Sequence, residues 1–190
     1  MRVIGLAGWS GSGKTTLLRR LLPHLVARGV AVSTVKHAHH TFDVDHPGKD
    51  SHAHRAAGAT EVLVSSSTRW ALMHELRGDA EPLLPILLAK MSRVDLVLVE
   101  GFKRGAHPKL EIFRAGVGKP LLAPHDRHIV AIASDADVPE ARVPVVSLDD
   151  LDAICALLLR HAMPVEQVVH EETGTETGRE QERPGGAAQG

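Results

Sequence analysis

The sequence has few of the side chains that mark secreted, zinc-binding or base-stacking proteins. It contains one cysteine among 190 residues, no tyrosine, and only 3% aromatic residues. A single cysteine, Cys155, can form neither an internal disulfide nor a cysteine-rich zinc site. With so few aromatic side chains, the stacking of nucleic-acid bases is not expected. These absences point to a cytoplasmic protein whose core is built from aliphatic residues.

Long apolar runs and a strong net charge are also absent. No run approaches the ~18 residues of a membrane span, and glycine interrupts the N-terminus too early for a signal-peptide core. The net charge is −1, with 20 basic and 17 acidic residues in 1–163 and an acidic excess in 164–190. We therefore expect neither a membrane nor a nucleic acid as partner. Residues 164–190 are predicted to be a disordered acidic tail after a domain at 1–163.

Strand and helix patterns alternate along residues 1–163. Alternation of this kind predicts an α/β fold with a mainly parallel sheet and helices on both faces. Residues 3–7, 30–35 and 95–100 are predicted as the three central strands. Further strands are predicted at 61–65, 70–76, 109–114, 129–134 and 143–147. Helices are predicted from Lys14 to a C-cap at Gly29, and at 50–57, 82–91 and 151–161.

A phosphate-binding motif lies between the first strand and the first helix. Its residues match G-x-x-x-x-G-K-[ST] without a gap: Gly8, Trp9, Ser10, Gly11, Ser12, Gly13, Lys14 and Thr15. Glycines let successive backbone N–H groups turn toward phosphate oxygens, and the helix adds its positive N-terminal end. The lysine then contacts the β- and γ-phosphates, and the threonine hydroxyl is a ligand for Mg²⁺. The sequence therefore predicts a P-loop NTPase fold that binds a Mg²⁺-bound nucleoside triphosphate.

Four more charged residues are candidates for the same site. Glu100 ends an apolar strand, where it would hold Mg²⁺ or orient a water, or would simply be a solvent-exposed strand end. Asp50 either senses the γ-phosphate or caps a helix. Lys103 and Lys109 either contact a second anionic ligand or are solvated surface charges.

Histidines are dense between residues 37 and 54: His37, His39, His40, His46, His52 and His54. Their spacing matches no zinc signature. A mobile polar loop, or one that neutralises phosphate, is the preferred interpretation over metal binding.

Further blocks of sequence accompany the P-loop. They are T-V-K-H-A-H-H at 34–40, D-H-P-G-K-D-S at 45–51, R-A-A-G-A at 55–59, V-E-G-F-K at 99–103 and P-K-L-E at 108–111. In this order and at these spacings, residues 1–160 resemble the MobB family of molybdopterin-guanine dinucleotide biosynthesis adapter proteins. The joint occurrence of the blocks is far more specific than the P-loop alone.

The resemblance implies GTP binding with slow intrinsic hydrolysis, a homodimer, and a partner, the guanylyltransferase that joins GMP to molybdopterin. Gly8 to Thr16 would hold the phosphates, with Thr15 and Glu100 near Mg²⁺. Lys14, Glu100 and Asp50 would be the catalytic residues. The block at 45–51 and the stretch from Lys103 to Lys109 would line the cleft for nucleotide or for the pterin phosphate.

Guanine preference rests on the resemblance alone. The sequence lacks the [NT]-K-x-D motif that reads guanine in many GTPases, and Asp135 is a weak substitute candidate. The alternative is a P-loop small-molecule kinase using ATP or GTP. Such kinases usually close an arginine-bearing lid over the phosphates, and no arginine-rich segment of this kind lies between the predicted strands.

Overall fold

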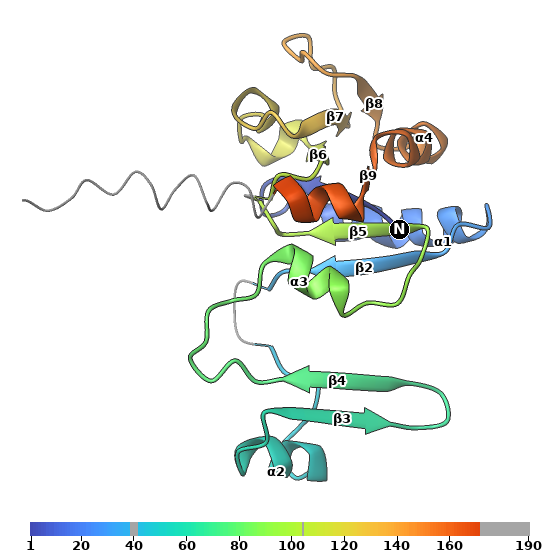
Figure 1. Cartoon of the computed structure of the whole chain (residues 1–190). Helices are drawn as coiled ribbons and strands as arrows, with labels where there is room; N and C mark the ends of the chain where they lie inside the picture. Colours follow the sequence, from blue (N-terminus) through green and yellow to red (C-terminus); the bar gives the residue numbers. More distant parts are fainter. Residues whose placement is uncertain (39–41, 104, 172–190) are drawn as a thin grey trace, which may run out of the picture. The chain divides into compact units, whose positions relative to one another are not determined.

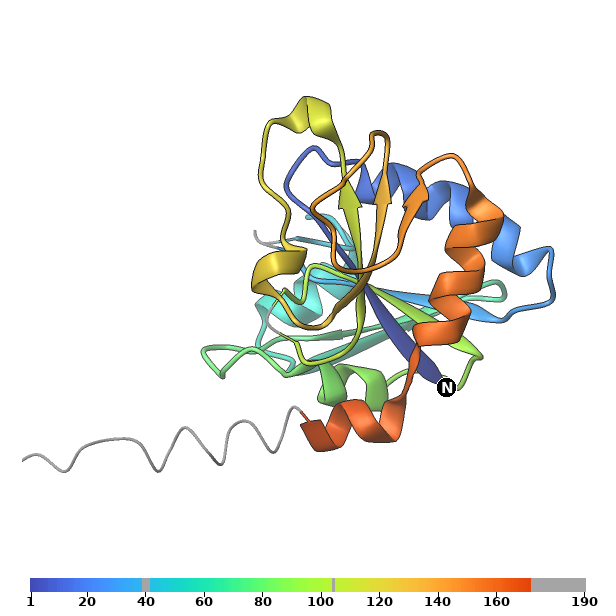
Figure 2. The same ribbon diagram turned by 90° about the horizontal axis from the view of Figure 1, so that it is seen from above.

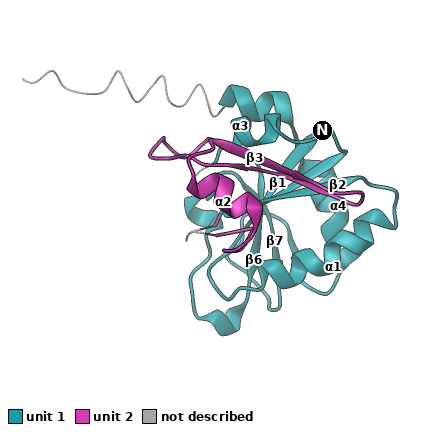
Figure 3. Ribbon diagram, turned by 90° about the horizontal axis from the view of Figure 1, so that it is seen from below, with its two compact units in different colours: residues 1–37, 84–190 teal, residues 38–83 magenta. Residues whose placement is uncertain are grey.

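The computed structural model describes residues 1–38, 42–103 and 105–171. The chain divides into two units: residues 1–37 with 84–190, and residues 38–83 (Figure 3). His39, His40 and the predicted tail from residue 172 onward lie outside the described residues.

A mainly parallel sheet forms the larger unit (Figure 1). Its order is β2-β5-β1-β6-β7-β8 among the described residues, and β9 pairs antiparallel with β1. The strands are β1 (Arg2–Ala7), β2 (Val32–Lys36), β5 (Leu96–Glu100), β6 (Lys109–Phe113), β7 (Ile129–Ser134), β8 (Val145–Ser147) and β9 (Met163–Pro164). Because β1 lies between β5 and β6, the loop that follows β1 leaves from the middle of the sheet.

The two faces of this sheet carry separate cores, because successive strand residues point to opposite sides. Ile4 and Leu98 pack on one face with α1 (Lys14–Val26) and α4 (Leu151–His161). On the other face, Val97 and its neighbours pack against α3 (Leu84–Ala89). Figure 2 shows α1 and α4 on one side of the strands and α3 on the other. The predicted α/β architecture is confirmed.

Two details of the prediction are wrong. Strand β2 is an edge strand, and the central trio is β5, β1 and β6. Hydrophobic pattern alone could not show this, since strand order depends on which chain segments cross over. The predicted boundary at 163 also cuts through packed structure. Residues 165–171 are helical, and Val168 is fully buried with α3 and β5.

The smaller unit contains α2 (Asp50–Ala56) and an antiparallel hairpin of β3 (Glu61–Ser65) and β4 (Trp70–His74). The strand predicted at 61–65 is confirmed, and the one predicted at 70–76 ends two residues earlier, at His74. On one face of the hairpin, Val62 pairs with Met73 and both are buried. On the other, Leu63 pairs with Leu72 and both are exposed.

One arginine connects several segments of the smaller unit through ion pairs. Arg55, in the last turn of α2, makes ion pairs with Asp43, Asp45 and Glu75. The hydrogen bond from Arg55 is the main reason that the pKa of Asp43 falls from its ordinary value to about 2. These contacts join the chain before α2, the helix, and the segment after β4.

Candidate functional site

The predicted P-loop has the geometry of an anion-binding turn. It leaves β1 at Ala7 and enters α1 at Lys14. Gly8, Gly11 and Gly13 all have positive φ angles, of 147°, 81° and 89°. A Cβ atom at Gly8 would lie 2.6 Å from Ser12 Oγ and 2.7 Å from the Ile112 carbonyl oxygen. Glycine is therefore required at position 8 for both conformation and space.

Lys14 folds back over this loop. Its Nζ donates hydrogen bonds to the carbonyl oxygens of Gly8, at 2.8 Å, and Trp9, at 2.9 Å. These bonds hold the ammonium group over the loop entrance, where a phosphate can replace the carbonyl partners. The pocket here has a volume of ≈ 350 Å³ and is lined by Ser10, Gly11, Gly13, Lys14, Thr15, Thr16 and Glu100.

Thr15 and Glu100 meet at the same pocket although 85 residues separate them. The Thr15 hydroxyl donates to Glu100 Oε1 at 3.3 Å. Glu100 ends β5, whose register places it beside Leu6 of β1, and it is 9% exposed. The structure thus brings together the two residues predicted to lie near Mg²⁺. A hydroxyl and a carboxylate are hard oxygen ligands of the kind that Mg²⁺ takes alongside phosphate oxygens and waters.

The described residues contain no group of three or more His, Cys, Asp or Glu residues suited to a metal ion. A magnesium site that takes most of its ligands from nucleotide and water does not need such a group.

Charged groups of both signs act on Lys14. Burial is the main cause that lowers the pKa of Lys14; Glu100 acts in the opposite direction, while Lys103 and Lys36 lower the pKa further. Lys36 ends β2 and Lys103 follows β5, so both lysines act on Lys14 from the carboxyl ends of parallel strands. A bound anion would relieve their mutual repulsion.

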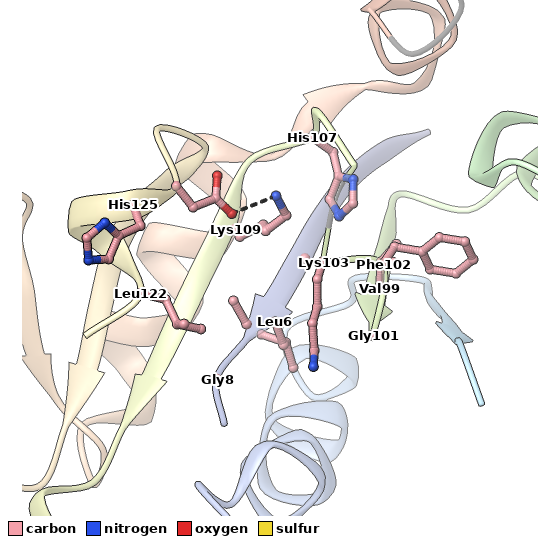
Figure 4. A pocket seen from close by; sticks show the side chains of 13 residues that line it. Leu6, Gly8, Val99, Gly101, Phe102, Lys103, His107, Lys109, Leu122 and His125 are labelled. Carbon is pink, nitrogen blue, oxygen red and sulfur yellow. Dashed lines mark hydrogen bonds and ion pairs between the residues drawn. The ribbon is translucent and has the colours of Figure 1, made fainter. Parts of the chain in front are cut away.

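A second pocket of ≈ 190 Å³ adjoins the start of the P-loop (Figure 4). Its lining is largely apolar, with charged and imidazole groups among the following residues: Gly5, Leu6, Ala7, Gly8, Val99, Gly101, Phe102, Lys103, His107, Lys109, Leu122, His125 and Asp126. Figure 4 shows Lys103 reaching along the pocket toward the carboxyl end of β1, while Phe102 points elsewhere. Lys103 is therefore the lysine that could meet an anion here.

Lys109 lines the same pocket but is already paired. Its Nζ donates to Asp126 Oδ2 at 2.9 Å and to the Gly105 carbonyl at 2.7 Å, and its side chain is only 3% exposed. This pair lies beside Gly5, where a Cβ atom would come within 3.0 Å of the Lys109 side chain and 2.7 Å of His107 Nε2. Glycine at position 5, in the middle of β1, therefore leaves room for the His107 and Lys109 side chains that line the pocket.

Gly101 makes a close approach on the other side of Glu100. Its φ is +100°, and a Cβ atom there would lie 2.9 Å from both Cβ and O of His37. The His37 backbone N–H donates to the Glu100 carbonyl at 2.8 Å, and its ring contacts Phe102. The strand end that carries Glu100 is thereby fixed against the end of β2.

The remaining predicted residues lie as follows. The Trp9 indole N–H donates to the Pro120 carbonyl at 2.7 Å, and Lys119 lies over its ring. Asp50 begins α2 in the smaller unit, and its role in nucleotide binding stays a prediction. Asp135, the candidate for guanine, forms an ion pair with Arg114.

Sequence reasoning missed Lys36 and Arg114 as site residues. Both stand at the carboxyl ends of parallel strands, which is the edge where ligands bind in open α/β sheets. A basic residue in that position is the signal that could have identified them.

Comparison with known proteins places the chain in a family. Residues 3–135 match the family model described as MobB, molybdopterin guanine dinucleotide synthesis protein B. The chain belongs to the MobB family. It is 44% identical over 155 residues to the molybdopterin-guanine dinucleotide biosynthesis adapter protein of Escherichia coli strain K12, covering 80% of this chain and 88% of the relative. The corresponding protein of Haemophilus influenzae is 42% identical over 135 residues, covering 70% of this chain and 74% of that protein.

Solved structures of the family agree with the fold. A crystal structure of molybdopterin-guanine biosynthesis protein B has a TM-score of 0.66 at 27% identity and covers 83% of this chain and 98% of the other. The MobB homolog from Bacillus stearothermophilus gives a TM-score of 0.59 at 27% identity, covering 84% and 97%.

Proposed function

We propose that this MobB-family chain is a GTP-binding adapter in molybdenum cofactor biosynthesis, which assists the attachment of GMP to molybdopterin. The observation that carries the nucleotide part of this proposal is the meeting of Lys14, Thr15 and Glu100 around one glycine-rich loop. The pathway follows from the family and from relatives named as adapter proteins in molybdopterin-guanine dinucleotide synthesis. No helix in the described residues has the length and apolar character needed to cross a membrane.

Each loop residue has a defined task in nucleotide binding. Lys14 would exchange the neutral carbonyl acceptors of Gly8 and Trp9 for anionic phosphate oxygens, so that donor and acceptor carry opposite charges. Backbone N–H groups of the loop would donate to the phosphates. Thr15 and Glu100 would hold Mg²⁺, which neutralises phosphate charge when bound.

We expect the intrinsic GTPase activity to be weak. Glu100 bonds Thr15 and would also hold the metal ion, so its carboxylate is not available to take a proton from an attacking water. Asp50, in the smaller unit, stays a predicted catalytic residue. A slow intrinsic rate suits an adapter whose partner completes the reaction.

The adjoining pocket supports a second anionic ligand, which in this pathway would be the phosphate-bearing molybdopterin. Lys103 lies close enough to Lys14 to lower its pKa, so anions in the two pockets would lie near each other. Lys109 would act indirectly, through its ion pair with Asp126.

The hairpin of the smaller unit supports a homodimer. Leu63, Trp70 and Leu72 are 61%, 63% and 42% exposed. By the cross-strand register, the three alternate onto one face: Leu63 opposite Leu72, and Trp70 opposite Ser65. Grouped exposed apolar side chains of this kind mark protein–protein contacts. A second copy would cover this face, and the guanylyltransferase is the proposed partner of the assembled adapter.

Nucleotide titration tests the proposal. Fluorescent GTP and ATP analogues would be titrated with and without Mg²⁺ into the wild type, Lys14→Ala, and the matched control Lys90→Ala, an exposed lysine after α3. We expect GTP to be preferred, Mg²⁺ to strengthen binding, and only Lys14→Ala to lose it. Binding retained in Lys14→Ala would contradict the phosphate site.

Equal affinity for ATP and GTP would remove the guanine preference and favour the alternative, a P-loop small-molecule kinase. The adjoining pocket would then take the phosphoryl acceptor. Stoichiometric release of ADP or GDP that depends on a small acceptor would establish that reading. A separate pull-down with the guanylyltransferase would test the adapter role.

A further inference from the structure

Arg114 lies outside the P-loop motif but connects the end of β6 to the P-loop. It follows β6 directly, and its Nε donates a hydrogen bond to the carbonyl oxygen of Ser12 at 3.2 Å. Ser12 lies inside the phosphate-binding turn and is 2% exposed. The arginine thus contacts the loop through its backbone.

This contact fixes the direction of a neighbouring N–H group. The carbonyl of Ser12 and the N–H of Gly13 belong to one planar trans peptide, so they point in opposite directions. When Arg114 holds the carbonyl on one side of the loop, the Gly13 N–H is held toward the other side. Donation from a guanidinium also polarises the peptide and strengthens its N–H as a donor.

Gly13 itself is shaped to admit the arginine. A Cβ atom at Gly13 would lie 3.1 Å from Arg114 Nε, and the residue has φ +89°. Any side chain at this position would press on the guanidinium and strain the backbone that begins α1. Glycine is therefore required at position 13 for two reasons: the backbone conformation of the phosphate-binding turn and the space that Arg114 occupies.

Asp135 holds Arg114 in place. Its Oδ2 lies 3.2 Å from Arg114 Nη1, and its Oδ1 accepts the backbone N–H of Ala115 at 3.1 Å. Both carboxylate oxygens are thus engaged at the end of β6, although Asp135 follows β7. These two contacts, with Arg114 and with the Ala115 N–H, set the orientation of the Asp135 carboxylate, and they give it a structural role that needs no guanine base.

We propose that Arg114 is a positioning residue for phosphate binding, held by Asp135, and that Asp135 does not select the base. The chain of contacts runs from Asp135 through Arg114 to Ser12 and so to the Gly13 N–H. This inference rests on the proposed nucleotide-binding function only in requiring that the loop binds phosphate groups. It is independent of which base is preferred.

The test compares ligands that share phosphates but differ in the base. Affinities for pyrophosphate, GDP, GTP and ATP would be measured by calorimetry for the wild type, Arg114→Met, Arg114→Lys, Asp135→Asn, the double variant Arg114→Met with Asp135→Asn, and Arg142→Met. Arg142 is an exposed arginine between β7 and β8 and is the matched control. Thermal melting of each free variant would show that the fold is kept.

We expect Arg114→Met to weaken pyrophosphate, GDP and GTP binding by the same factor, roughly tenfold, which is the worth of a charge-assisted hydrogen bond. Asp135→Asn should weaken them roughly threefold and add nothing in the Arg114→Met background. The ratio of GTP to ATP affinity should not change in either variant. Arg114→Lys should recover only part of the loss, because lysine lacks the planar fork that contacts Ser12 and Asp135 together.

Three results would overturn the proposal. They are unchanged pyrophosphate affinity in Arg114→Met, full recovery in Arg114→Lys, which would make charge alone sufficient, or a changed GTP to ATP ratio in Asp135→Asn. If the wild type binds pyrophosphate but does not prefer GTP, the guanine assignment fails while this inference stands. An Arg114→Met variant that melts early is replaced by Asp135→Asn, which keeps the arginine.

Discussion

The two units of the chain differ in how they bury their apolar side chains. The larger unit buries apolar side chains on both faces of its sheet, with α1 and α4 on one side and α3 on the other. In the smaller unit, Val62 and Met73 are the buried apolar pair, and they are 8% and 9% exposed. The opposite hairpin face keeps Leu63 and Leu72 exposed.

The difference shows where each unit obtains its stability. A seven-stranded sheet among the described residues has enough covered surface to stand alone, whereas a two-stranded hairpin is marginal in water without something packed on it. Helix α2 contacts β3, and Arg55 ties the surrounding loops together. The smaller unit therefore keeps an exposed apolar face, to which we assign the proposed association, and the larger unit carries the proposed nucleotide site.

The largest expected effect comes from truncating the core of the larger unit. Leu98, on β5, is 1% exposed, so Leu98→Ala should lower the free energy of unfolding by about 3 kcal/mol through lost burial and a cavity. Met73→Ala in the smaller unit should cost about 2 kcal/mol, the low end for such truncations, because its core is thin and can collapse. Urea denaturation measures the first and hydrogen exchange of the hairpin the second. Equal losses of unfolding free energy in the two variants would contradict the difference between the units.

Next in size is the loss of the buried ion pair below the second pocket. Asp126→Asn leaves the Lys109 ammonium without its charged partner and should cost about 2 kcal/mol at pH 7, less than a fully buried pair because Asp126 is 24% exposed.

This penalty should depend on pH. Burial acts to raise the pKa of Asp126, but hydrogen bonds from Lys109 and His128 outweigh it, so the net pKa lies below its ordinary value of 3.8. A carboxyl whose folded pKa is depressed stabilises the protein above its unfolded pKa and loses that contribution as pH falls through the folded pKa. The difference between wild type and Asp126→Asn should therefore shrink below pH 3.8 in urea titrations. A difference that is constant from pH 7 to acid would contradict the ion-pair account.

A smaller free-energy change should separate association from nucleotide binding. Leu72→Glu on the exposed hairpin face should weaken the proposed homodimer at least roughly tenfold, because a charge would be buried at the contact. Sedimentation velocity across a concentration series would measure this. The matched control is Ser67→Glu, which adds the same charge at the hairpin turn. GTP affinity should stay unchanged, and a wild type that is monomeric throughout would refute the dimer.

The smallest expected effect concerns the Arg55 cluster. Asp43 has a pKa of about 2 through its hydrogen bond from Arg55, so its contribution is present above the ordinary value of 3.8 and is lost as pH falls toward 2. Asp43→Asn should slightly increase hydrogen exchange in the smaller unit at neutral pH and leave the larger unit unchanged. Because Asp43 is exposed, solvent screens most of the interaction. A change in the exchange of β1 or β5 would argue against independent units.

Much of the fold could be predicted from local signals. The ends of β7 and α4 match the predicted ranges, since an apolar run marks each of them in the sequence. The helix at 165–171 was missed because acidic composition suggested disorder from residue 164. In the structure, Val168 is buried and Val165 packs against the same core, and these two apolar residues hold the helix to the sheet.

The candidate site could be predicted in part. Gly8 to Thr15 form a contiguous motif whose chemistry is set by the order of residues, and the structure brings Glu100 to Thr15 as predicted. Lys36 and Arg114 were missed because each is isolated in the sequence, and their proximity to the loop depends on strand order. The pairing of Asp135 with Arg114 was invisible for the same reason.

By itself, the sequence determined the phosphate-binding loop, the elements on either side of it, and the resemblance to the MobB family, which the comparisons confirmed. These features are local, since contiguous residues set the turn, the helix start and the period of apolar residues. Only the tertiary structure decided that β2 lies at the edge, that Lys109 is committed to Asp126, and that Arg114 holds the loop through Ser12. Those contacts join residues far apart in the chain, and their existence depends on which strands lie next to each other in the sheet.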